Sequence, residues 1–244
     1  MGVTKKFYKD ILYYEIEGFN QFKNITHLFS TRIGWDQKNI FDDLGKILGL
    51  NDDRIYRAKQ VHGKEIIIIG NQDNKTIGQE EADGFITKVK GIALCTYHAD
   101  CVPIYFYDKG EDVIGIAHAG WKGTLNNIAG VIIDNMVKEY GSNLSNIVVA
   151  IGPSIGACCY EIGEDVEKLF NETFDNPEII IDKNEKIYLD LWKVNYINLL
   201  DAGIKEGNIY QSNFCTACNL DTLYSYRKEK ATKNRMIAAI TLNE

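Results

Sequence analysis

One segment, Leu94–Thr124, constrains the fold of this chain more than any other, because it predicts a β-hairpin. Aromatic and β-branched residues run from Val102 to Tyr107, and a second apolar run spans Val113 to Ala117. Between them lies Asp108-Lys-Gly-Glu, whose composition is typical of a turn. The two runs are therefore expected to pair as antiparallel strands at the centre of a sheet.

The register of this hairpin predicts a site. If the turn is centred between Lys109 and Gly110, Cys101 lies opposite His118, with Cβ atoms about 4.5–5.5 Å apart. A thiolate and an imidazole at that separation can share Zn²⁺ or a copper ion, or can act as nucleophile and base. The alternative is a small buried thiol beside a hydrogen-bonded core histidine, which is the commoner role of either residue alone.

Two further residues are candidates for the same site. His62 lies in Gln60-Val-His-Gly63, directly before an apolar run at 65–69, and is the natural third ligand. Asp83 follows an acidic turn just upstream of the hairpin and is a candidate general acid or base. His98 is expected to point away from Cys101, because side chains alternate along a strand, although it could orient the ligands.

Composition predicts one catalytic domain over residues 1–244. The chain has three prolines, 45% hydrophobic and 25% charged residues, and no linker-like tract. It lacks both a membrane-length apolar run and a hydrophobic signal core, and it has six cysteines, so we expect reduced thiols and a cytoplasmic location. A net charge of −7 argues against nucleic acid as a partner. We expect a monomer or a weak homodimer.

The remaining segments mix helical and strand patterns. Helices are predicted where apolar residues recur at helical spacing, and strands where short apolar runs are bounded by turns. We expect helices at 41–50, 125–140 with Thr124 as its cap, 166–174 and 191–203 with Asp190 as its cap, and strands at 65–69, 146–151 and 236–242. This irregular order predicts an α+β fold, a mixed α/β sandwich with a central β-hairpin and helices packed outside.

Several loops carry candidate substrate contacts. Ser30 and Arg32 end a predicted strand, where Arg offers a fork of donors to an anion. The glycine-rich loop at 152–160 could pass over a ligand, with Tyr160 stacking on it. Cys215 and Cys218 have the spacing of a zinc knuckle but lack a second pair of that spacing, so a structural zinc is the less favoured interpretation, and adjacent Cys158 and Cys159 have no assigned role.

Taken together, a series of motifs resembles the laccase-like polyphenol oxidase family. The motifs are His27-Leu-Phe-Ser-Thr-Arg, Gln60-Val-His-Gly, Glu81-Ala-Asp-Gly, Ala99-Asp-Cys-Val-Pro, Ala117-His-Ala-Gly-Trp-Lys-Gly, Ile151-Gly-Pro-Ser-Ile-Gly-Ala-Cys-Cys-Tyr-Glu and Tyr224-Ser-Tyr-Arg. Members of that family are also described as broad-specificity purine nucleoside phosphorylases with adenosine deaminase activity.

The resemblance implies that His62, Cys101 and His118 bind a metal, Zn²⁺ with Cu²⁺ as a possible occupant. It also implies that the substrates are phosphate and a purine nucleoside: adenosine, inosine, guanosine or methylthioadenosine. On this basis Asp83 would move protons, and Arg32 with Arg235 would anchor phosphate. The contacts expected for substrate are Ser30, Arg32, Gln60, Tyr160 and Arg235. The chain departs from the family pattern at Trp35, where the loop is shorter, and near Lys233-Asn-Arg235.

Other functions stay open. A copper-dependent polyphenol oxidase of the multicopper type needs a histidine-rich cluster besides a His₂Cys site, and four histidines cannot supply both. A metal-free hydrolase could use Cys101 as nucleophile and His118 as base. A non-catalytic sensor of a nucleotide or a peptidoglycan fragment would bind its ligand without turnover.

Overall fold

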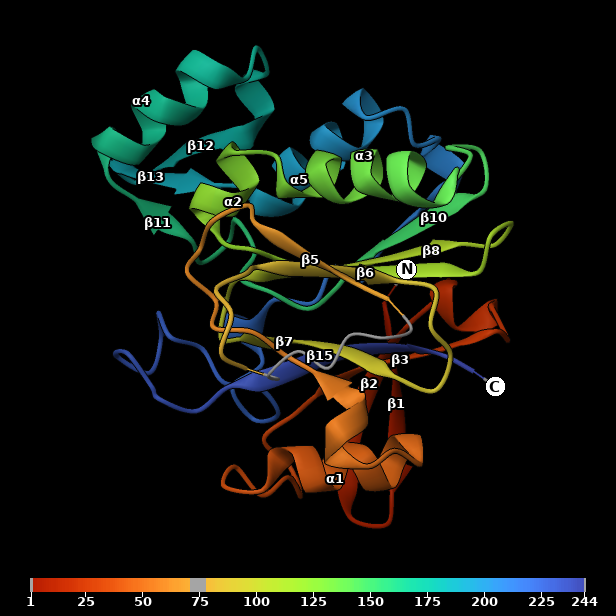
Figure 1. The fold of residues 1–244 in the computed structure, drawn as a ribbon. Helices are drawn as coiled ribbons and strands as arrows, with labels where there is room; N and C mark the ends of the chain where they lie inside the picture. Colours follow the sequence, from red (N-terminus) through yellow and green to blue (C-terminus); the bar gives the residue numbers. More distant parts are fainter. Residues whose placement is uncertain (1, 71–77, 244) are drawn as a thin grey trace.

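Two six-stranded mixed sheets form the centre of the computed structural model, which describes residues 2–70 and 78–243 (Figure 1). The first sheet has the order β1 (Val3–Tyr8), β2 (Ile11–Ile16), β3 (Ile25–Ser30), β15 (Met236–Leu242), β7 (Ala93–His98) and β4 (Ile55–Tyr56). The second has the order β14 (Ile209–Gln211), β10 (Ile147–Ile151), β8 (Val102–Asp108), β9 (Val113–Ala119), β6 (Gly84–Thr87) and β5 (Ile66–Ile69).

Helices cover the outer faces of this pair of sheets (Figure 1). The helices are α1 (Ile40–Leu48), α2 (Trp121–Leu125), α3 (Ile128–Tyr140), α4 (Glu164–Thr173) and α5 (Leu191–Asp201). A small third sheet beside α4 is formed by β11 (Glu161–Ile162), β13 (Lys186–Leu189) and β12 (Ile180–Lys183). Helix α1 lies below the first sheet in Figure 1, and α3 and α5 lie above the second. Among the described residues, no helix has the length and apolar character needed to cross a membrane.

Alternation along β8 explains why the layers stack in this way. Tyr105 and Tyr107 point into the apolar core between the two sheets, whereas Ile104 and Phe106 point into the core that contains α3 and α5. A strand buried on both faces is a continuous apolar run, as the sequence shows. The same pattern places Ile237 and Ala239 of β15 against α1. The expected α+β sandwich with a central hairpin is therefore confirmed.

The hairpin register differs from the expected one. Pro103, not Cys101, lies opposite His118, because the turn is longer and its centre lies one residue farther along the chain. The Asp108 carboxylate accepts the N–H of Gly110 at 2.8 Å, and Asp112 has a φ of 50°, so four residues separate the strands. Cys101 therefore precedes β8 and does not lie within the paired strands.

Most helix ends match the sequence prediction, with one exception. Asp190 caps α5 by accepting the N–H of Lys193, as expected. The cap of α3 is Asn127, whose side chain accepts the N–H of Gly130. Thr124 lies inside the short helix α2, so its predicted capping role was wrong. Apolar spacing located α3 correctly. It did not reveal that a separate short helix, α2, ends at Leu125 just before α3 begins.

The contact between α3 and the second sheet makes a measurable prediction. Met136 is fully buried in this core, and its neighbour Val137 is 41% exposed. We expect Met136→Ala to lower the free energy of unfolding by about 2–5 kcal/mol, because it opens a cavity. Val137→Ala, one residue away on the solvent side, should change it by less than about 0.5 kcal/mol. Urea denaturation of both variants measures this, and equal effects would contradict the assigned core.

Candidate metal centre and pocket

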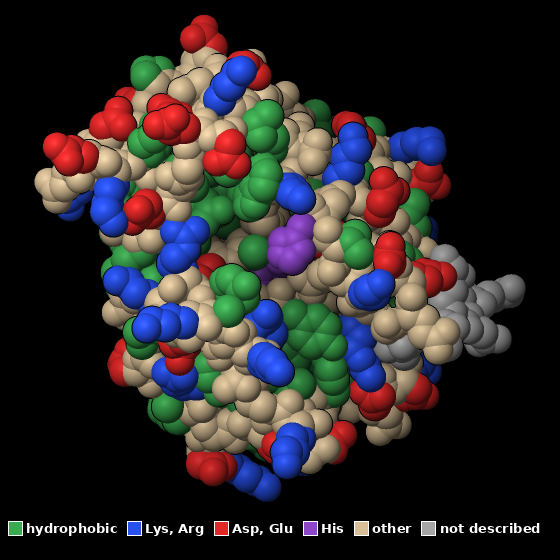
Figure 2. All heavy atoms as spheres, turned by 90° about the vertical axis from the view of Figure 1, so that its left-hand side faces the viewer, with side chains coloured by type: hydrophobic (Ala, Val, Ile, Leu, Met, Phe, Trp, Pro, Cys, Tyr) green, Lys and Arg blue, Asp and Glu red, His purple; other side chains and the backbone are tan. Residues whose placement is uncertain are grey.

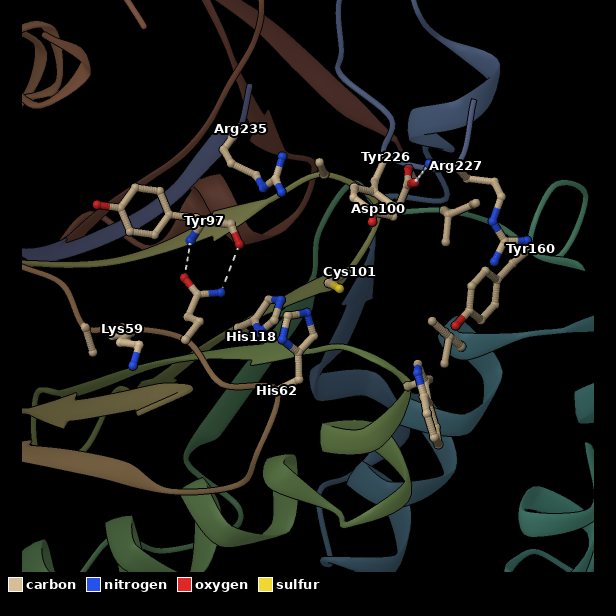
Figure 3. Close-up of a pocket in the computed structure, with 16 residues that line it drawn as sticks. Lys59, His62, Tyr97, Asp100, Cys101, His118, Tyr160, Tyr226, Arg227 and Arg235 are labelled. Atoms are coloured by element: carbon tan, nitrogen blue, oxygen red, sulfur yellow. Dashed lines mark hydrogen bonds between the residues drawn. The ribbon is translucent and has the colours of Figure 1, made fainter. Parts of the chain in front are cut away.

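Side chains of His62, Cys101 and His118 converge at one end of the sandwich (Figure 3). One donor atom from each residue lies within 4.8 Å of those of the other two, so the three could hold a metal ion. They come from three segments: the loop after β4, the connection from β7 to β8, and the end of β9. The trio nominated from the sequence is thus brought together in space.

Cys101 is positioned by a sharp connection between the two sheets. Strand β7 belongs to the first sheet and β8 to the second, and the chain crosses between them through residues 99–101. Asp100 has a φ of 97°, a strained conformation for a residue with a side chain. Its buried carboxylate accepts hydrogen bonds from Thr216 Oγ1 at 2.6 Å, Ser225 Oγ at 3.0 Å and the N–H of Arg227 at 2.7 Å. These bonds hold the strained turn.

Asp83 positions both histidines. Its Oδ1 lies 2.8 Å from Nδ1 of His118 and accepts the backbone N–H of His62 at 3.1 Å. Its Oδ2 accepts the N–H groups of Val61 at 3.2 Å and Gly63 at 2.7 Å. A carboxylate on Nδ1 leaves Nε2 of His118 available for a metal. Asp83 is fully buried behind His118 and does not line the pocket. It is therefore placed to orient the two histidines, whereas a proton shuttle would be expected to reach the pocket.

The electrostatics of the trio favour a bound cation. Burial alone would raise the pKa of the Cys101 thiol, but the charge of His118 and hydrogen bonds from both histidines lower it to about 6. Burial would lower the pKa of His118, but the Cys101 thiolate and Asp83 raise it to about 9. Without a metal the site therefore holds a thiolate and an imidazolium. A metal ion bound here would take the place of that proton, and the thiolate is the form that binds metals.

Gly120 allows the three ligands to approach the backbone closely. A Cβ atom at this position would lie 3.0 Å from Cδ2 of His62 and 3.2 Å from Sγ of Cys101. These are shorter than ordinary van der Waals contacts, so a side chain here would displace a ligand. The glycine that follows the His-Ala pair in the sequence thus has a steric role at the centre.

The other two histidines have different partners. His98 Nδ1 bonds the carbonyl of Cys101 at 3.0 Å and its Nε2 bonds Thr96 Oγ1 at 2.8 Å, so both ring nitrogens are used. It supports the Cys101 backbone and its pKa is well below the usual value, chiefly because it is buried. Nε2 of His27 accepts the N–H of Ile16 at 2.8 Å, and burial lowers the His27 pKa to about 3. Neither joins the trio.

The trio lines a pocket of about 780 Å³, with His118 buried and His62 exposed. Figure 2 shows this hollow face, with purple histidine at its centre, hydrophobic side chains above and below, and Lys and Arg around it. The lining consists of Ala58, Lys59, Gln60, His62, Tyr97, Ala99, Asp100, Cys101, His118, Trp121, Ile155, Tyr160, Leu191, Tyr226, Arg227 and Arg235. Its size and its mixture of aromatic and cationic groups suit a small molecule with an aromatic part and an anionic part.

Three of the five predicted substrate contacts line this pocket: Gln60, Tyr160 and Arg235. The amide of Gln60 is already paired with the backbone of Tyr97, donating to its carbonyl at 3.0 Å and accepting its N–H at 2.6 Å (Figure 3). Arg235 donates to the carbonyls of Thr232 and Asn234 at 2.6 and 2.9 Å, which orients its guanidinium.

Ser30 and Arg32 lie outside the pocket lining, contrary to expectation. Ser30 is fully buried, and its Oγ accepts the N–H of Ile237 at 2.7 Å. Arg32 donates to the carbonyl of Leu220 and to Glu229 at 2.7 Å, and its guanidinium lies 4.4 Å from the ring centre of Tyr224. Its fork of donors is thus used to fasten the segment that carries pocket residues 226 and 227.

Sequence reasoning missed other pocket residues. Arg227, Tyr226, Tyr97 and Lys59 all line the cavity. Arg227 and Tyr226 belong to the Tyr224-Ser-Tyr-Arg motif, which was a signal, but the motif alone did not show which side chains face the site. Trp35, at the departure from the family pattern, is buried beside α1, and its indole N–H bonds the carbonyl of Leu12 at 2.7 Å.

Comparison with known proteins identifies the family. A family model described as multi-copper polyphenol oxidoreductase laccase matches residues 37–243. The human protein named purine nucleoside phosphorylase LACC1 is 31% identical over 233 residues, which are 89% of this chain and 51% of that protein. The chain thus spans about half the length of this relative.

Bacterial relatives match over more of their length. Purine nucleoside phosphorylase YlmD of Geobacillus stearothermophilus is 34% identical over 225 residues, covering 87% of this chain and 82% of that protein. A crystal structure of YlmD from the same organism superimposes with a TM-score of 0.90 at 28% identity, over 100% of both chains. A protein from an unknown prokaryotic organism, adenosine deaminase RL5, is 27% identical over 93% of this chain and 90% of its own.

The position of Asp83 predicts a loss of metal affinity in Asp83→Asn. The amide would turn an N–H₂ group toward backbone N–H donors and weaken the hold on His118, so we expect metal affinity to fall about 10–100-fold. Competition with a chromophoric chelator measures this. Glu65→Gln is the matched control, because Glu65 is exposed on the neighbouring segment. Unchanged affinity with lost turnover would instead identify Asp83 as a proton shuttle.

The Cys101 pKa predicts the reactivity of the metal-free protein. A pKa lowered to about 6 means that the thiolate predominates above pH 6, so alkylation of Cys101 should reach its plateau near pH 7 and decline below pH 6. Peptide mass spectrometry after timed iodoacetamide exposure measures it. Buried Cys95, whose pKa is raised, serves as the unreactive internal control. An inflection near pH 9 for Cys101 would contradict the charge pairing.

Proposed function

We propose that this chain, which belongs to the multi-copper polyphenol oxidoreductase laccase family, is a zinc-dependent purine nucleoside phosphorylase. The observation that carries the proposal is a His₂Cys centre in the lining of a pocket that also presents cations and aromatic rings. The names of the human and Geobacillus relatives support the choice of reaction. Both substrates would be small molecules, consumed in a cytoplasm where the thiols stay reduced.

The donor set fits zinc. Two imidazoles and one thiolate with an open fourth position are typical of a catalytic Zn²⁺ site. The Asp83 carboxylate fixes the tautomer of His118, as is usual for a metal-bound histidine. Bound there, zinc would supply Lewis acidity. Copper could compete for the same ligands, but oxidase chemistry of the multicopper type needs a second histidine cluster, and His27 and His98 have partners elsewhere.

Phosphate would be bound by the cations of the pocket. The protein carries a net charge of −7, yet Arg227 and Arg235 both line this cavity. Lys59 lines it as well, but its ammonium is paired with Glu81 at 2.7 Å. Figure 3 shows Arg235 on one side of the trio, and Arg227 with Tyr160 on the other. The Arg227 guanidinium lies 5.0 Å from the Tyr160 ring centre and donates to the Glu161 carbonyl, which holds it against the wall. Guanidinium groups are well suited to phosphate because they donate in a fixed fork.

The proposed positions of the two substrates indicate how the reaction would proceed. Tyr160, Tyr226 and Trp121 provide flat apolar surfaces for a purine ring. A phosphate oxygen forms the new bond to C1′ of the ribose, while the bond from C1′ to the purine nitrogen breaks and its electron pair leaves with the base. The base then takes a proton. The arginines hold phosphate against the sugar, so that positioning supplies much of the acceleration.

Adenosine deamination is a second candidate, favoured by the donor set and by the relative named adenosine deaminase RL5. Water would add to C6 of the purine and ammonia would leave. This reaction usually employs a carboxylate beside the metal. Among the described lining residues the one carboxylate is Asp100, and it already accepts three hydrogen bonds. We therefore rank deamination below phosphorolysis.

The test is chromatography of products from inosine and adenosine, with and without phosphate. We expect hypoxanthine and adenine to appear only with phosphate. Hypoxanthine without phosphate would indicate a hydrolase, and inosine from adenosine would establish the deaminase. Ligand binding without any product, in protein shown to contain its metal, would favour a sensor.

Phosphate binding by the pocket arginines predicts a specific kinetic change. Arg227→Ala should raise the KM for phosphate at least 10-fold, because a charge-assisted contact is lost. Arg54→Ala is the control, since Arg54 is exposed in a short helix away from the pocket lining. Initial rates at varied phosphate and saturating inosine measure both. An unchanged phosphate KM in Arg227→Ala would exclude this residue from the phosphate site.

A further inference from the structure

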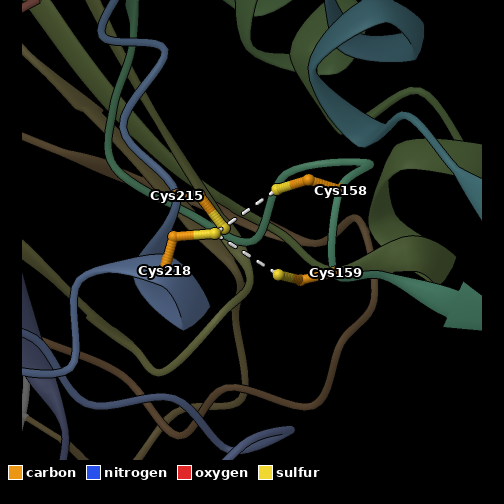
Figure 4. Close-up of side chains that lie close together, drawn as sticks. All are labelled: Cys158, Cys159, Cys215 and Cys218. Carbon is orange, nitrogen blue, oxygen red and sulfur yellow. Dashed lines mark hydrogen bonds between the residues drawn. The ribbon is translucent and has the colours of Figure 1, made fainter.

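A second group of side chains that could bind a metal lies partly at the surface, outside the pocket lining. Cys158, Cys159, Cys215 and Cys218 bring their sulfur atoms within 4.8 Å of one another (Figure 4). Two of the distances are 3.6 Å, from Cys158 Sγ to Cys218 Sγ, and 3.4 Å, from Cys159 Sγ to Cys218 Sγ. The two pairs are about 60 residues apart in the sequence, and the fold brings them together.

We propose that these four cysteines bind a structural Zn²⁺ ion as a tetrathiolate site, separate from the His62, Cys101 and His118 centre. Four thiolates give zinc a closed tetrahedral shell without an open position, which is the arrangement of structural sites. The role of the ion would be to join the glycine-rich loop at 152–160 to the segment at 214–218. The proposal does not depend on which reaction the pocket catalyses.

The sulfur separations favour a single ion. Sulfurs about 2.3 Å from a central zinc lie about 3.8 Å from one another at the corners of a tetrahedron. The observed separations are close to that value and far from the bond length of about 2.0 Å in a disulfide. An iron–sulfur cluster places more than one iron between its four cysteines, so sulfurs bound to different irons would be farther apart than in this compact group.

Burial does not explain the cluster. Free cysteines usually behave as small buried hydrophobes. Here Cys215 is buried, but Cys158 and Cys218 are exposed and Cys159 is half-buried. Exposed thiols gain little from packing on one another. Their convergence at the surface is better explained by a ligand that all four bind.

The backbone around the cysteines is already fixed in the arrangement that such a site needs. The N–H of Ser154 donates to the Phe214 carbonyl at 3.2 Å, and the N–H of Thr216 donates to the Ser154 carbonyl at 3.0 Å. The N–H of Gly156 points at Sγ of Cys215 at 3.3 Å, as in sites where backbone N–H groups stabilise thiolate ligands. A tight turn from Gly156 to Tyr160 then presents both adjacent cysteines to the same point.

The sequence pattern obscured this site. Cys215 and Cys218 have knuckle spacing, but their partners are adjacent residues and not a second pair of that spacing. The location also matters for the pocket. Ile155 and Tyr160 of the loop line the pocket, as do Tyr226 and Arg227 beyond the second cysteine pair. An ion at this position would therefore stabilise the side of the pocket that carries Arg227, the proposed phosphate contact.

Zinc content distinguishes the two sites. Protein prepared with zinc under oxygen-free, reducing conditions should contain two zinc ions per chain. Cys218→Ser and Cys158→Ser should each contain one, and His62→Ala should contain one that resides at the four cysteines. Cys95→Ala, which removes a buried cysteine that belongs to neither group, should keep two. Zinc content in Cys218→Ser equal to that of the unaltered protein would overturn the proposal.

Two further measurements leave all four cysteines in place. In zinc-loaded unaltered protein, Cys158 and Cys218 should resist alkylation although they are exposed. Their rate of alkylation should rise at least 10-fold once a chelator is added. Equal reactivity before and after chelation would overturn the site. Co²⁺-loaded His62→Ala should show the strong thiolate-to-cobalt absorption of a four-thiolate ion. A weak spectrum, or a disulfide between two of the four cysteines in place of the metal, would overturn it as well.

Discussion

The candidate centre depends on the hydrogen bonds that the Asp83 carboxylate accepts. One buried side chain accepts hydrogen bonds from three consecutive backbone N–H groups of the His62 loop and contacts the His118 ring. Burial alone would raise its pKa, but these bonds hold the pKa below its usual value, so it stays ionised. That charge favours protonated or metal-bound His118 and fixes the loop, because an ionised acceptor makes stronger hydrogen bonds than a neutral one.

Asp100 has the corresponding role for Cys101. The chain passes from the first sheet to the second at this residue, in a strained conformation that three hydrogen bonds compensate. Those bonds come from Thr216, Ser225 and the backbone of Arg227. Asp100 therefore positions both Cys101 and the segment that carries Arg227. Strain held in this way is common at functional sites, where it fixes a reactive side chain before the substrate arrives. The pocket thus unites residues that are distant in the sequence.

Much of the fold could be predicted from local patterns. Strand β15 at Met236–Leu242, the cap of α5 at Asp190 and the hairpin runs all follow from short-range rules of spacing and capping. The hairpin register was wrong because the Asp108 side chain lengthens the turn, and propensity does not encode that contact. Even so, the right cysteine and histidine were paired, since the Asp100 turn brings Cys101 back toward β9.

Sites that depend on contacts between distant segments were harder to predict. Arg32 has the chemistry of an anion site, but its donors are used by Leu220 and Glu229 on a segment almost 200 residues away in the chain. Arg227 was not singled out for the same reason, because only the fold shows that it faces the cavity. The four-cysteine group joins two pairs whose spacings differ. In each case the decisive fact is a tertiary contact, which a single sequence does not reveal.

The proposed reaction requires a metal held by His62, Cys101 and His118. The decisive measurement is phosphate-dependent release of hypoxanthine from inosine before and after a chelator strips the protein of metal, and again after zinc is returned. We expect loss of turnover on stripping, recovery with zinc, and no turnover in His62→Ala at any zinc concentration. Full turnover by the stripped protein, abolished when Cys101 is alkylated, would contradict this requirement and identify a metal-free Cys101–His118 catalyst.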